Sequence, residues 1–399
     1  MVGTRRKPGR MGPFVEGYRL WLTEAGYTSG TIRNMLQILG DLGRWMELQE
    51  VEPAELGLET LETFRQGWGL ARVPSMRSLA PMAEFLKSQG LFADRAMSET
   101  SVDLMLADYQ LWLIGQRGLS AATVLRYVNT ARRFLQDQPA GGNGLPADAL
   151  SGEHVVAFLL DEGSRVSVGA VKGRVAELRS LLRFAYLRGL TPRPLAEAVP
   201  PVAGWHQTGV PKSVTGRELR RMLKYCDTTT PVGIRDFAIL MLVARLGLRS
   251  IEVARLELGD IDWRGGRITL RGKAGREDGM PLPVDVGEAL ATYLRRVRPV
   301  TAVRNVFIAV KAPLRGIRPD LVSDVTRRAC DRAGLPRFGA HRLRHSLATE
   351  MLRGGASMVE ISQVLRHRDL ATTAIYAKVD FATLRTVARP WPGARSWPI

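Results

Sequence analysis

Hydrophobic residues recur at helical spacing along most of this chain. Between residues 14 and 95, and again between 101 and 191, leucine, aromatic and aliphatic positions repeat every three or four residues. Both stretches are therefore predicted to be bundles of amphipathic helices. Residues 237–247 (FAILMLVARLG) are almost wholly apolar, which predicts a buried helix ending at Gly247. We expect Asp236 to cap the start of this helix.

A different pattern follows the apolar helix. Residues 261–263 and 267–271 flank Gly265-Gly266, and a third apolar stretch lies near residues 280–282. Glycine pairs between short β-prone runs are typical of hairpins, so the pattern predicts a small antiparallel sheet. Lys273 falls in the turn between the second and third strands.

A capping signature marks a further helix near the end of the chain. Ser357 and Glu360 are spaced as a capping box, and the apolar face of the helix is predicted to comprise Val359, Ile361 and Leu365. The fold class is thus predicted to be mostly α and multidomain. Helical N-terminal domains precede a mixed α+β domain with a small antiparallel sheet.

Part of the first helical stretch recurs in the second. Tyr18 and Trp21 are echoed by Tyr109 and Trp112, and Phe85 is echoed by Phe184. The offset between the copies drifts from 91 to 99 residues, which indicates two diverged copies rather than a solenoid. Aromatic residues at this spacing are typical of a core.

The charge of the chain is strongly basic. The 57 lysines and arginines exceed the 39 acidic residues by 18, which favours a polyanionic partner. The alternative is that the excess arginine only keeps the protein soluble. Cys226 and Cys330 are too few for a disulfide framework or a metal cluster, so a cytoplasmic location is expected. The sequence has no run of eighteen apolar residues, so no membrane span is expected.

Histidine, arginine and tyrosine residues near the end of the chain form a spaced pattern: His341-x-x-Arg344-His345, Leu365-Arg366-His367 and Thr372-Thr373-Ala374-Ile375-Tyr376. The spacings are 23 residues from Arg344 to His367 and 9 from His367 to Tyr376. This pattern resembles the C-terminal signature of the tyrosine recombinase (phage integrase) family. Arg366 departs from it, because many members carry glycine there.

The resemblance implies a catalytic set: Arg249, Lys273, His341, Arg344, His367 and the nucleophile Tyr376. Two guanidinium groups can each donate paired N–H bonds to a phosphate, and a tyrosine can attack it without a metal or ATP. Lys273 would protonate the leaving 5′ oxygen, with Lys311 as a distant competitor. Glu252 and His345 would support the catalytic groups. No cofactor and no metal are expected.

The resemblance also divides the chain. We expect a basic flexible arm (1–12), an extra helical domain that is a diverged copy of the next (13–98), a core-binding helical domain (99–192), a proline-rich linker (193–212), a catalytic domain (213–380) and a C-terminal tail (381–399). Arg126, Arg132 and Arg133 follow the first helix joint of the core-binding domain, where they could contact DNA phosphates. A solvated basic face is the alternative for each. The extra domain would contact either DNA or protein.

The function implied is a site-specific DNA recombinase or integrase of a mobile element or phage. It would act on double-stranded DNA through a 3′-phosphotyrosyl intermediate, as a homotetramer on two DNA sites. Exchange of the C-terminal tail and accessory recombination proteins are candidate interactions. Alternatives with the same chemistry are a telomere resolvase and a type IB topoisomerase. A non-catalytic DNA-binding regulator on the same fold is the alternative from another class.

Overall fold

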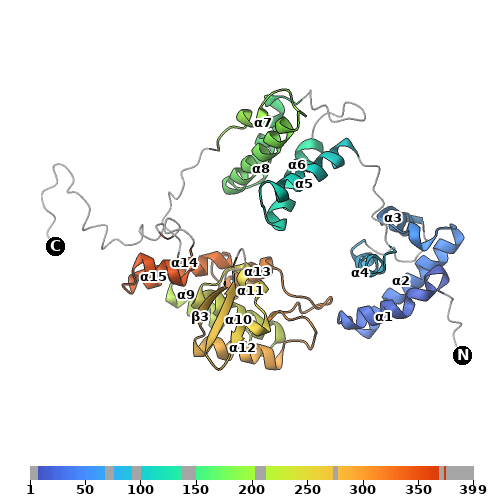
Figure 1. Ribbon diagram of the computed structural model, residues 1–399. Helices are drawn as coiled ribbons and strands as arrows, with labels where there is room; N and C mark the ends of the chain where they lie inside the picture. Colours follow the sequence, from blue (N-terminus) through green and yellow to red (C-terminus); the bar gives the residue numbers. More distant parts are fainter. Residues whose placement is uncertain are drawn as a thin grey trace, which may run out of the picture. The chain divides into compact units, whose positions relative to one another are not determined.

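The computed structural model describes residues 8–67, 76–91, 100–136, 150–202, 213–272, 277–367 and 373. The chain divides into two compact units, one of residues 94–206 and the other of residues 1–93 together with 207–399. The described residues are mostly helical with a single three-stranded antiparallel sheet, so the predicted fold class is confirmed (Figure 1). None of the described helices has the length and apolarity needed to cross a bilayer.

The first helical stretch contains η1 (Gly9–Phe14), α1 (Val15–Glu24), α2 (Ser29–Leu48), η2 (Pro53–Glu55), α3 (Leu58–Gly67) and α4 (Met76–Ser88). Residues 9–12 were expected in a flexible arm, and for them the prediction is wrong: they lie in the 3₁₀ helix η1, where Met11 is fully buried. The close approach of this segment to α2 requires glycine. A Cβ at Gly43 would collide with the carbonyl of Pro8.

The second stretch contains α5 (Ser101–Gly115), α6 (Ala121–Gln136), α7 (Gly152–Arg165), α8 (Val168–Leu187) and η4 (Leu195–Ala198). Residues 195–199 were expected in an extended linker, but they fold onto this domain. Val199 is 1% exposed, and its carbonyl accepts a hydrogen bond of 2.9 Å from Arg179 on α8. Burial of this valine outweighs the extended preference of the surrounding prolines.

Residues paired by the internal repeat have matching environments. Tyr18 packs on Phe85 with ring centroids 5.0 Å apart, and Tyr109 packs on Phe184 at 5.1 Å. A tryptophan three residues after each tyrosine completes both aromatic sets. The glycine five residues after each phenylalanine has positive φ, +71° and +68°, as a helix-ending turn requires. The two domains therefore share both their core contacts and their turn geometry.

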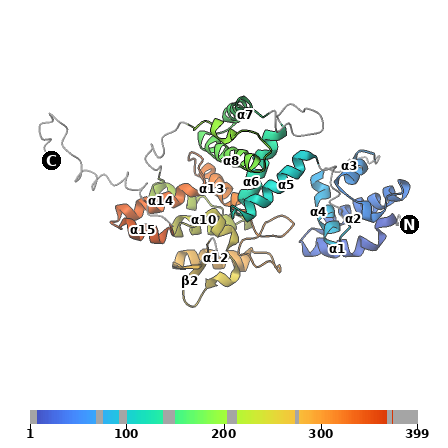
Figure 2. The same ribbon diagram turned by 45° about the horizontal axis from the view of Figure 1, so that its top comes forward.

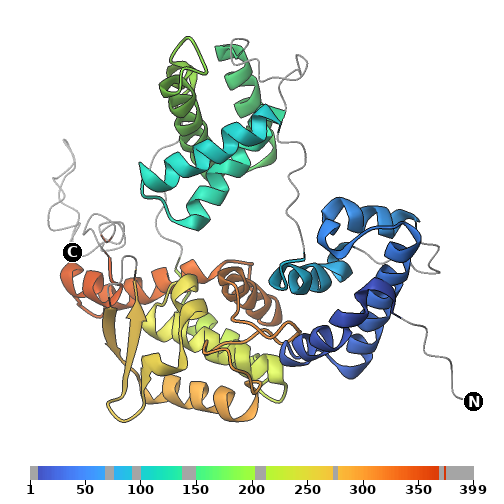
Figure 3. The ribbon, with the colours of Figure 1, turned by 45° about the vertical axis from the view of Figure 1, so that its right-hand side comes forward.

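The third domain contains the sheet: α9 (Gly216–Lys224), α10 (Pro231–Leu246), α11 (Ser250–Arg255), η5 (Leu258–Asp260), β1 (Ile261–Asp262), β2 (Arg267–Arg271), β3 (Glu277–Pro281), α12 (Val284–Arg296), α13 (Pro319–Arg332), α14 (Ala340–Arg353) and α15 (Met358–Val364). Helix α10 runs through its middle and contacts α9, α11, α12, α13 and α14 (Figure 2). The strands lie at one side of the domain, with α14 and α15 passing across their end (Figure 3).

Helix α10 is buried as its apolar sequence predicts, but its start differs from the prediction. The helix begins at Pro231, and the N-cap is Thr230, whose Oγ1 accepts a 3.1 Å hydrogen bond from the N–H of Gly233. Asp236 lies inside the helix and forms a 3.0 Å ion pair with Arg328 of α13. Proline at the first helical position favours the earlier start. Gly247 ends the helix with φ +60°, as predicted.

The sheet has the predicted order β1-β2-β3, and its third strand is longer than expected. Strand β3 starts at Glu277, opposite Arg271, and ends at Pro281, opposite Arg267. The apolar pattern indicated only the end of this strand, because Glu277, Asp278 and Gly279 carry no β-forming signal. Lys273, predicted in the turn between the second and third strands, lies outside the described residues.

The predicted apolar face of α15 is wrong in one position. Ile361 and Leu365 are fully buried, whereas Val359 is 53% exposed. Two residues span about 200° around a helix, so Val359 faces away from Ile361. The capping box of Ser357 and Glu360 is present as predicted.

Candidate active site

Arg344 on α14 lies at the centre of the candidate site. It is 1% exposed, and its two terminal nitrogens donate hydrogen bonds to the carbonyls of Gly247 and Leu365. These carbonyls stand at the C-terminal ends of α10 and α15. Helix ends carry carbonyls without intrahelical partners and a partial negative charge, so a buried cation is stabilised there. Arg344 thereby joins two helix ends that are far apart in the sequence.

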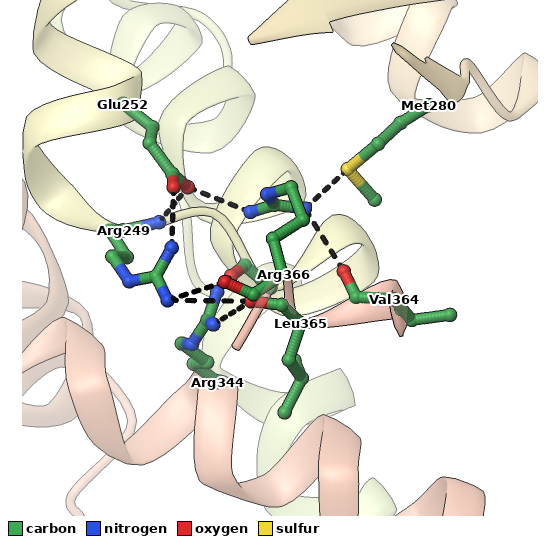
Figure 4. Close-up of polar contacts among 8 residues, drawn as sticks. Arg249, Glu252, Met280, Arg344, Val364, Leu365 and Arg366 are labelled. Carbon is green, nitrogen blue, oxygen red and sulfur yellow. Dashed lines mark hydrogen bonds and ion pairs between the residues drawn. The ribbon is translucent and has the colours of Figure 1, made fainter. Parts of the chain in front are cut away.

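Arg249 reaches the same point from the joint between α10 and α11. Its Nη2 donates to the carbonyls of Arg366 at 3.1 Å and Leu365 at 3.5 Å. Glu252 accepts a 2.7 Å hydrogen bond from Arg249 Nη1 and another of 2.7 Å from the Arg249 backbone N–H, so it fixes both the backbone and the side chain of Arg249. Arg249 and Arg344 thus converge on the carbonyl of Leu365 (Figure 4).

A pocket of about 280 Å³ opens beside the two arginines. The residues that line it are Leu248, Arg249, Ser250, Ile251, Pro319, Ala340, His341 and Arg344. Pro319 is the first residue of α13 and Ala340 the first of α14, so the N-terminal ends of two fourteen-residue helices border the pocket. Helix N-termini and guanidinium groups both favour anions, so the pocket is suited to a phosphate.

His341 and His345 lie one helical turn apart on α14. Their rings contact edge-to-face, with centroids 4.3 Å apart. Burial, followed by the charges of Arg344 and Arg249, lowers the pKa of His341 below its usual value. Burial, followed by the charges of His341 and Arg344, lowers the pKa of His345 to about 4. Both rings are therefore expected to be neutral at physiological pH.

His367 follows α15 and completes the described cluster. Its Nδ1 lies 2.7 Å from Oγ1 of Thr373, a fully buried residue. Burial, followed by the charges of Arg344 and Arg249, lowers the pKa of His367 to about 4. A neutral ring held at Nδ1 by a hydroxyl leaves Nε2 as its second polar atom for a ligand.

Four of the six predicted catalytic residues are thus near one another. The Arg249 and Arg344 side chains meet at the Leu365 carbonyl, His341 lines the same pocket, and the pKa of His367 responds to both arginines. Lys273 and Tyr376 lie outside the described residues. Lys311 is exposed in the loop before Gly316, and it does not line the pocket.

The three arginines predicted to contact DNA from α6 are all ion-paired within their domain. The pairs are Arg126–Glu177 at 2.6 Å, Arg132–Asp103 at 2.7 Å and Arg133–Glu162 at 2.8 Å. Glu162 and Glu177 are buried, whereas the arginine side chains are 43–59% exposed. Each guanidinium is therefore oriented by a carboxylate and still reaches solvent. Contact with DNA stays a prediction.

Sequence reasoning missed the role of two features at the site. The carbonyl of Leu365 accepts hydrogen bonds from both arginines that were predicted to be catalytic, and the Arg366 side chain turns into the site, where it forms a 2.7 Å ion pair with Glu252. The unusual arginine was visible in the sequence. The direction of its side chain depends on the backbone turn, which the sequence pattern alone does not give.

Comparison with known proteins agrees with this geometry. The phage integrase family model matches residues 212–383. A putative integrase/recombinase of Sinorhizobium fredii, y4rA, is 39% identical over 392 residues, covering 96% of this chain and 93% of that protein. The tyrosine recombinase XerD of Mycobacterium tuberculosis is 33% identical over 73% of this chain and 97% of its own length.

Solved structures show the same fold. A lambda integrase dimer bound to a COC′ core site has a TM-score of 0.54 at 16% identity and covers 68% of this chain and 94% of its own. The XerH recombinase bound to a palindromic difH substrate has a TM-score of 0.51 at 17% identity, with 96% of both chains covered.

A helical fold with a small sheet, and two arginines that meet beside a pocket lined by His341, agree with the class of protein that these comparisons indicate, the site-specific recombinases. The chain belongs to the phage integrase family and is a tyrosine-type site-specific recombinase.

Proposed function

We propose that this recombinase cleaves and rejoins double-stranded DNA through a 3′-phosphotyrosyl bond at Tyr376. The observation that carries the proposal is the convergence of Arg249 and Arg344 on one carbonyl beside a pocket at two helix N-termini. The roles of Tyr376 and Lys273 rest on the family resemblance. We expect the enzyme to act for a mobile element or phage.

The two arginines would bind the non-bridging oxygens of the scissile phosphate. As the Tyr376 oxygen attacks phosphorus, negative charge accumulates on those oxygens, and fixed donors stabilise it without reorganising. Loss of one such donor typically raises the barrier by about 3 kcal/mol. Arg344 is held by two carbonyls and Arg249 by Glu252, so both are positioned before the substrate arrives.

The histidines would orient the phosphate as neutral groups. Burial and the two arginines lower the pKa values of His341 and His367, so neither ring adds a charge at neutral pH. A neutral ring can donate one hydrogen bond to a phosphate oxygen and accept or return a proton. Lys273 would supply the proton for the leaving 5′ oxygen. His345 supports His341 through the ring contact.

We further propose that four copies act on two DNA sites. A lambda integrase tetramer bound to a Holliday junction shares the fold, with a TM-score of 0.53. The core-binding domain (99–192) would hold the duplex opposite the catalytic domain, and the tail (381–399) would contact a neighbouring copy. Between residues 100 and 202, basic residues exceed acidic ones, whereas residues 8–91 carry eight basic against ten acidic residues. This contrast favours protein contact over DNA contact for the first domain.

The test is covalent capture. The protein is incubated with a pool of short duplexes of random sequence, each nicked so that the cleaved fragment diffuses away, and adducts are recovered under denaturing conditions. Wild type is expected to form adducts whose sequenced DNA defines the target, while Tyr376→Phe forms none. Tight binding without an adduct would instead favour a non-catalytic regulator.

The recovered sequence then separates the remaining alternatives. Exchange between two plasmids that each carry the site is expected of a recombinase. Relaxation of a supercoiled plasmid without exchange would favour a type IB topoisomerase, and hairpin ends would favour a telomere resolvase.

A further inference from the structure

Arg366 occupies a backbone conformation that normally belongs to glycine. Its φ is +52°, and among the described residues only Glu50 shares this property without being glycine. A side chain in this region is strained, and such strain persists where surrounding contacts over-determine it. Glycine at position 366 would relax the turn, so the contacts of the arginine side chain compensate for the strain.

The Arg366 side chain is buried against three elements. It is 6% exposed, and Nη2 forms a 2.7 Å ion pair with Oε2 of Glu252. Nη1 donates to the carbonyl of Val364 at 3.0 Å and contacts the sulfur of Met280 on β3. Nε makes no hydrogen bond with the residues that the structure describes. The ion pair with Glu252 is thus the dominant polar contact of a buried cation.

These contacts close a ring around Glu252. The carboxylate of Glu252 accepts from Arg249 through Oε1 and from Arg366 through Oε2. The backbone carbonyl of Arg366 in turn accepts a 3.1 Å hydrogen bond from Arg249 Nη2. Arg366 therefore holds Arg249 twice, once through Glu252 and once through its own backbone (Figure 4).

We propose that Arg366 is a positioning residue for DNA cleavage, which fixes Glu252 and leaves the charge of Arg249 available to the scissile phosphate. The inference rests on the proposed role of Arg249. If Glu252 were paired with Arg249 alone, the carboxylate would cancel the positive charge that the phosphate needs. With two arginines sharing one carboxylate, a net positive charge remains at the pocket.

The ionisation of Glu252 depends on the same contact. Burial pushes the pKa of Glu252 up, but the charge of Arg366, followed by hydrogen bonds and the charge of Arg249, outweighs burial and holds the pKa below its usual value. The charged groups that face this carboxylate from the described elements are Arg249, the N-cap of α11, and Arg366 after α15, while β3 contributes the uncharged Met280. Without Arg366, burial remains and the pKa of Glu252 rises.

Arg366→Gly and Arg366→Gln test the inference in the full-length protein. Glycine relaxes the turn and removes the whole side chain, while glutamine keeps most of the packing without the charge. Cleavage is measured under single-turnover conditions, on the nicked duplex recovered by covalent capture, from about pH 8 to about pH 5.5. Both variants are expected to cleave about 10- to 100-fold more slowly. This is the loss typically measured when a residue that orients a directly acting group is removed, as in the outer shell of metal sites.

The pH dependence separates positioning from a structural role. The deficit of both variants is expected to shrink as the pH falls, because Glu252 without Arg366 binds a proton more readily and then no longer cancels the charge of Arg249, whereas in wild type Arg366 keeps Glu252 ionised and compensates its charge. Combining Arg366→Gly with Glu252→Gln is expected to cost no more than Glu252→Gln alone. Glu50→Gly, which relaxes the other non-glycine residue with positive φ, is the matched control and is expected to leave cleavage unchanged.

Wild-type cleavage rates in both Arg366 variants would overturn the inference, as would a deficit that is equal at every pH. The proposed function fails separately, because it requires an adduct from wild type that is absent in Tyr376→Phe. An adduct of that kind together with normal Arg366 variants would remove only the role of Arg366.

Discussion

Replacing Arg344 with lysine keeps the positive charge but removes the two terminal nitrogens of the guanidinium group, which donate in two fixed directions. In wild type, two nitrogens of Arg344 separately bind the carbonyls of Gly247 and Leu365. A lysine ammonium is a single point and cannot reproduce two bonds with fixed geometry. Arg344→Lys therefore leaves one buried carbonyl at a helix end without this donor.

The cost can be worked from these contacts. A buried acceptor left without a partner destabilises a protein by about 1–3 kcal/mol. In a domain of this size each 1 kcal/mol lowers the melting temperature by about 2–4 °C, so a decrease of about 2–12 °C is expected. In the proposed mechanism Arg344 also binds the scissile phosphate, and loss of that paired contact would add about 2.7–4 kcal/mol to the barrier, or about a 10²- to 10³-fold loss of cleavage rate.

Thermal unfolding and single-turnover cleavage of the captured duplex measure the two effects. Arg342→Lys, a half-buried arginine two residues earlier on α14, is the matched control and is expected to cleave normally. If Arg344→Lys melts within one degree of wild type and cleaves within threefold of the wild-type rate, the reasoning is refuted. Neither the two guanidinium hydrogen bonds nor the position of the charge would then contribute to stability or to cleavage.

Three further predictions follow from the site and from α6. Thr373→Val removes the hydroxyl that lies against Nδ1 of His367, and with it a hydrogen bond that typically contributes about 0.5–1.5 kcal/mol. Cleavage is expected to slow by about 2- to 13-fold, and Thr373→Ser is expected to cleave at nearly the wild-type rate. An unchanged rate in Thr373→Val would contradict a role for this contact. The pKa values of His345 and His367 are about 4 in the folded protein and about 6.5 in the unfolded chain. As the pH falls from about 6.5 toward 4, the unfolded chain binds protons at these residues and the folded protein does not. The free energy of unfolding therefore decreases over this range. The melting temperature should fall over that range, and less steeply in His345→Gln; equal slopes would contradict this assignment. Neutralising Arg126, Arg132 or Arg133 should each reduce the salt dependence of binding to the captured duplex by about one counterion if the residue contacts phosphate. If the dependence of binding affinity on salt concentration is unchanged, that arginine does not contact phosphate and only forms its ion pair with a carboxylate.

Local signals predicted much of the fold. The apolar run of α10, the glycine pair between β1 and β2 and the capping box of α15 are all present. The errors lie where tertiary contacts decide. Met11 is buried although its surroundings look like a flexible arm, and the η4 segment folds although it is rich in proline.

The candidate site was predictable in its residue types and spacing, and less so in its supporting contacts. The pairing of Arg249 with Glu252 follows from their spacing of three residues at the start of α11, where Arg249 is the N-cap and Glu252 lies in the first turn. The meeting of Arg249 and Arg344 at the Leu365 carbonyl brings Arg249 to a residue 116 positions away, and no local pattern encodes it. The same holds for Arg366 and Glu252, whose contact depends on a left-handed turn that the sequence would assign to glycine.

The most direct test of the central claim is the identity of the residue that carries DNA in the captured adduct. Trypsin cuts after Arg368 and Lys378 and releases Asp369–Lys378, a peptide whose only tyrosine is Tyr376. Mass spectrometry after nuclease digestion is expected to find a 3′-nucleotide on Tyr376 in wild type, and much less adduct in Arg249→Gln and Arg344→Gln. A nucleotide on another residue, or full adduct yield without the two arginines, would contradict the account.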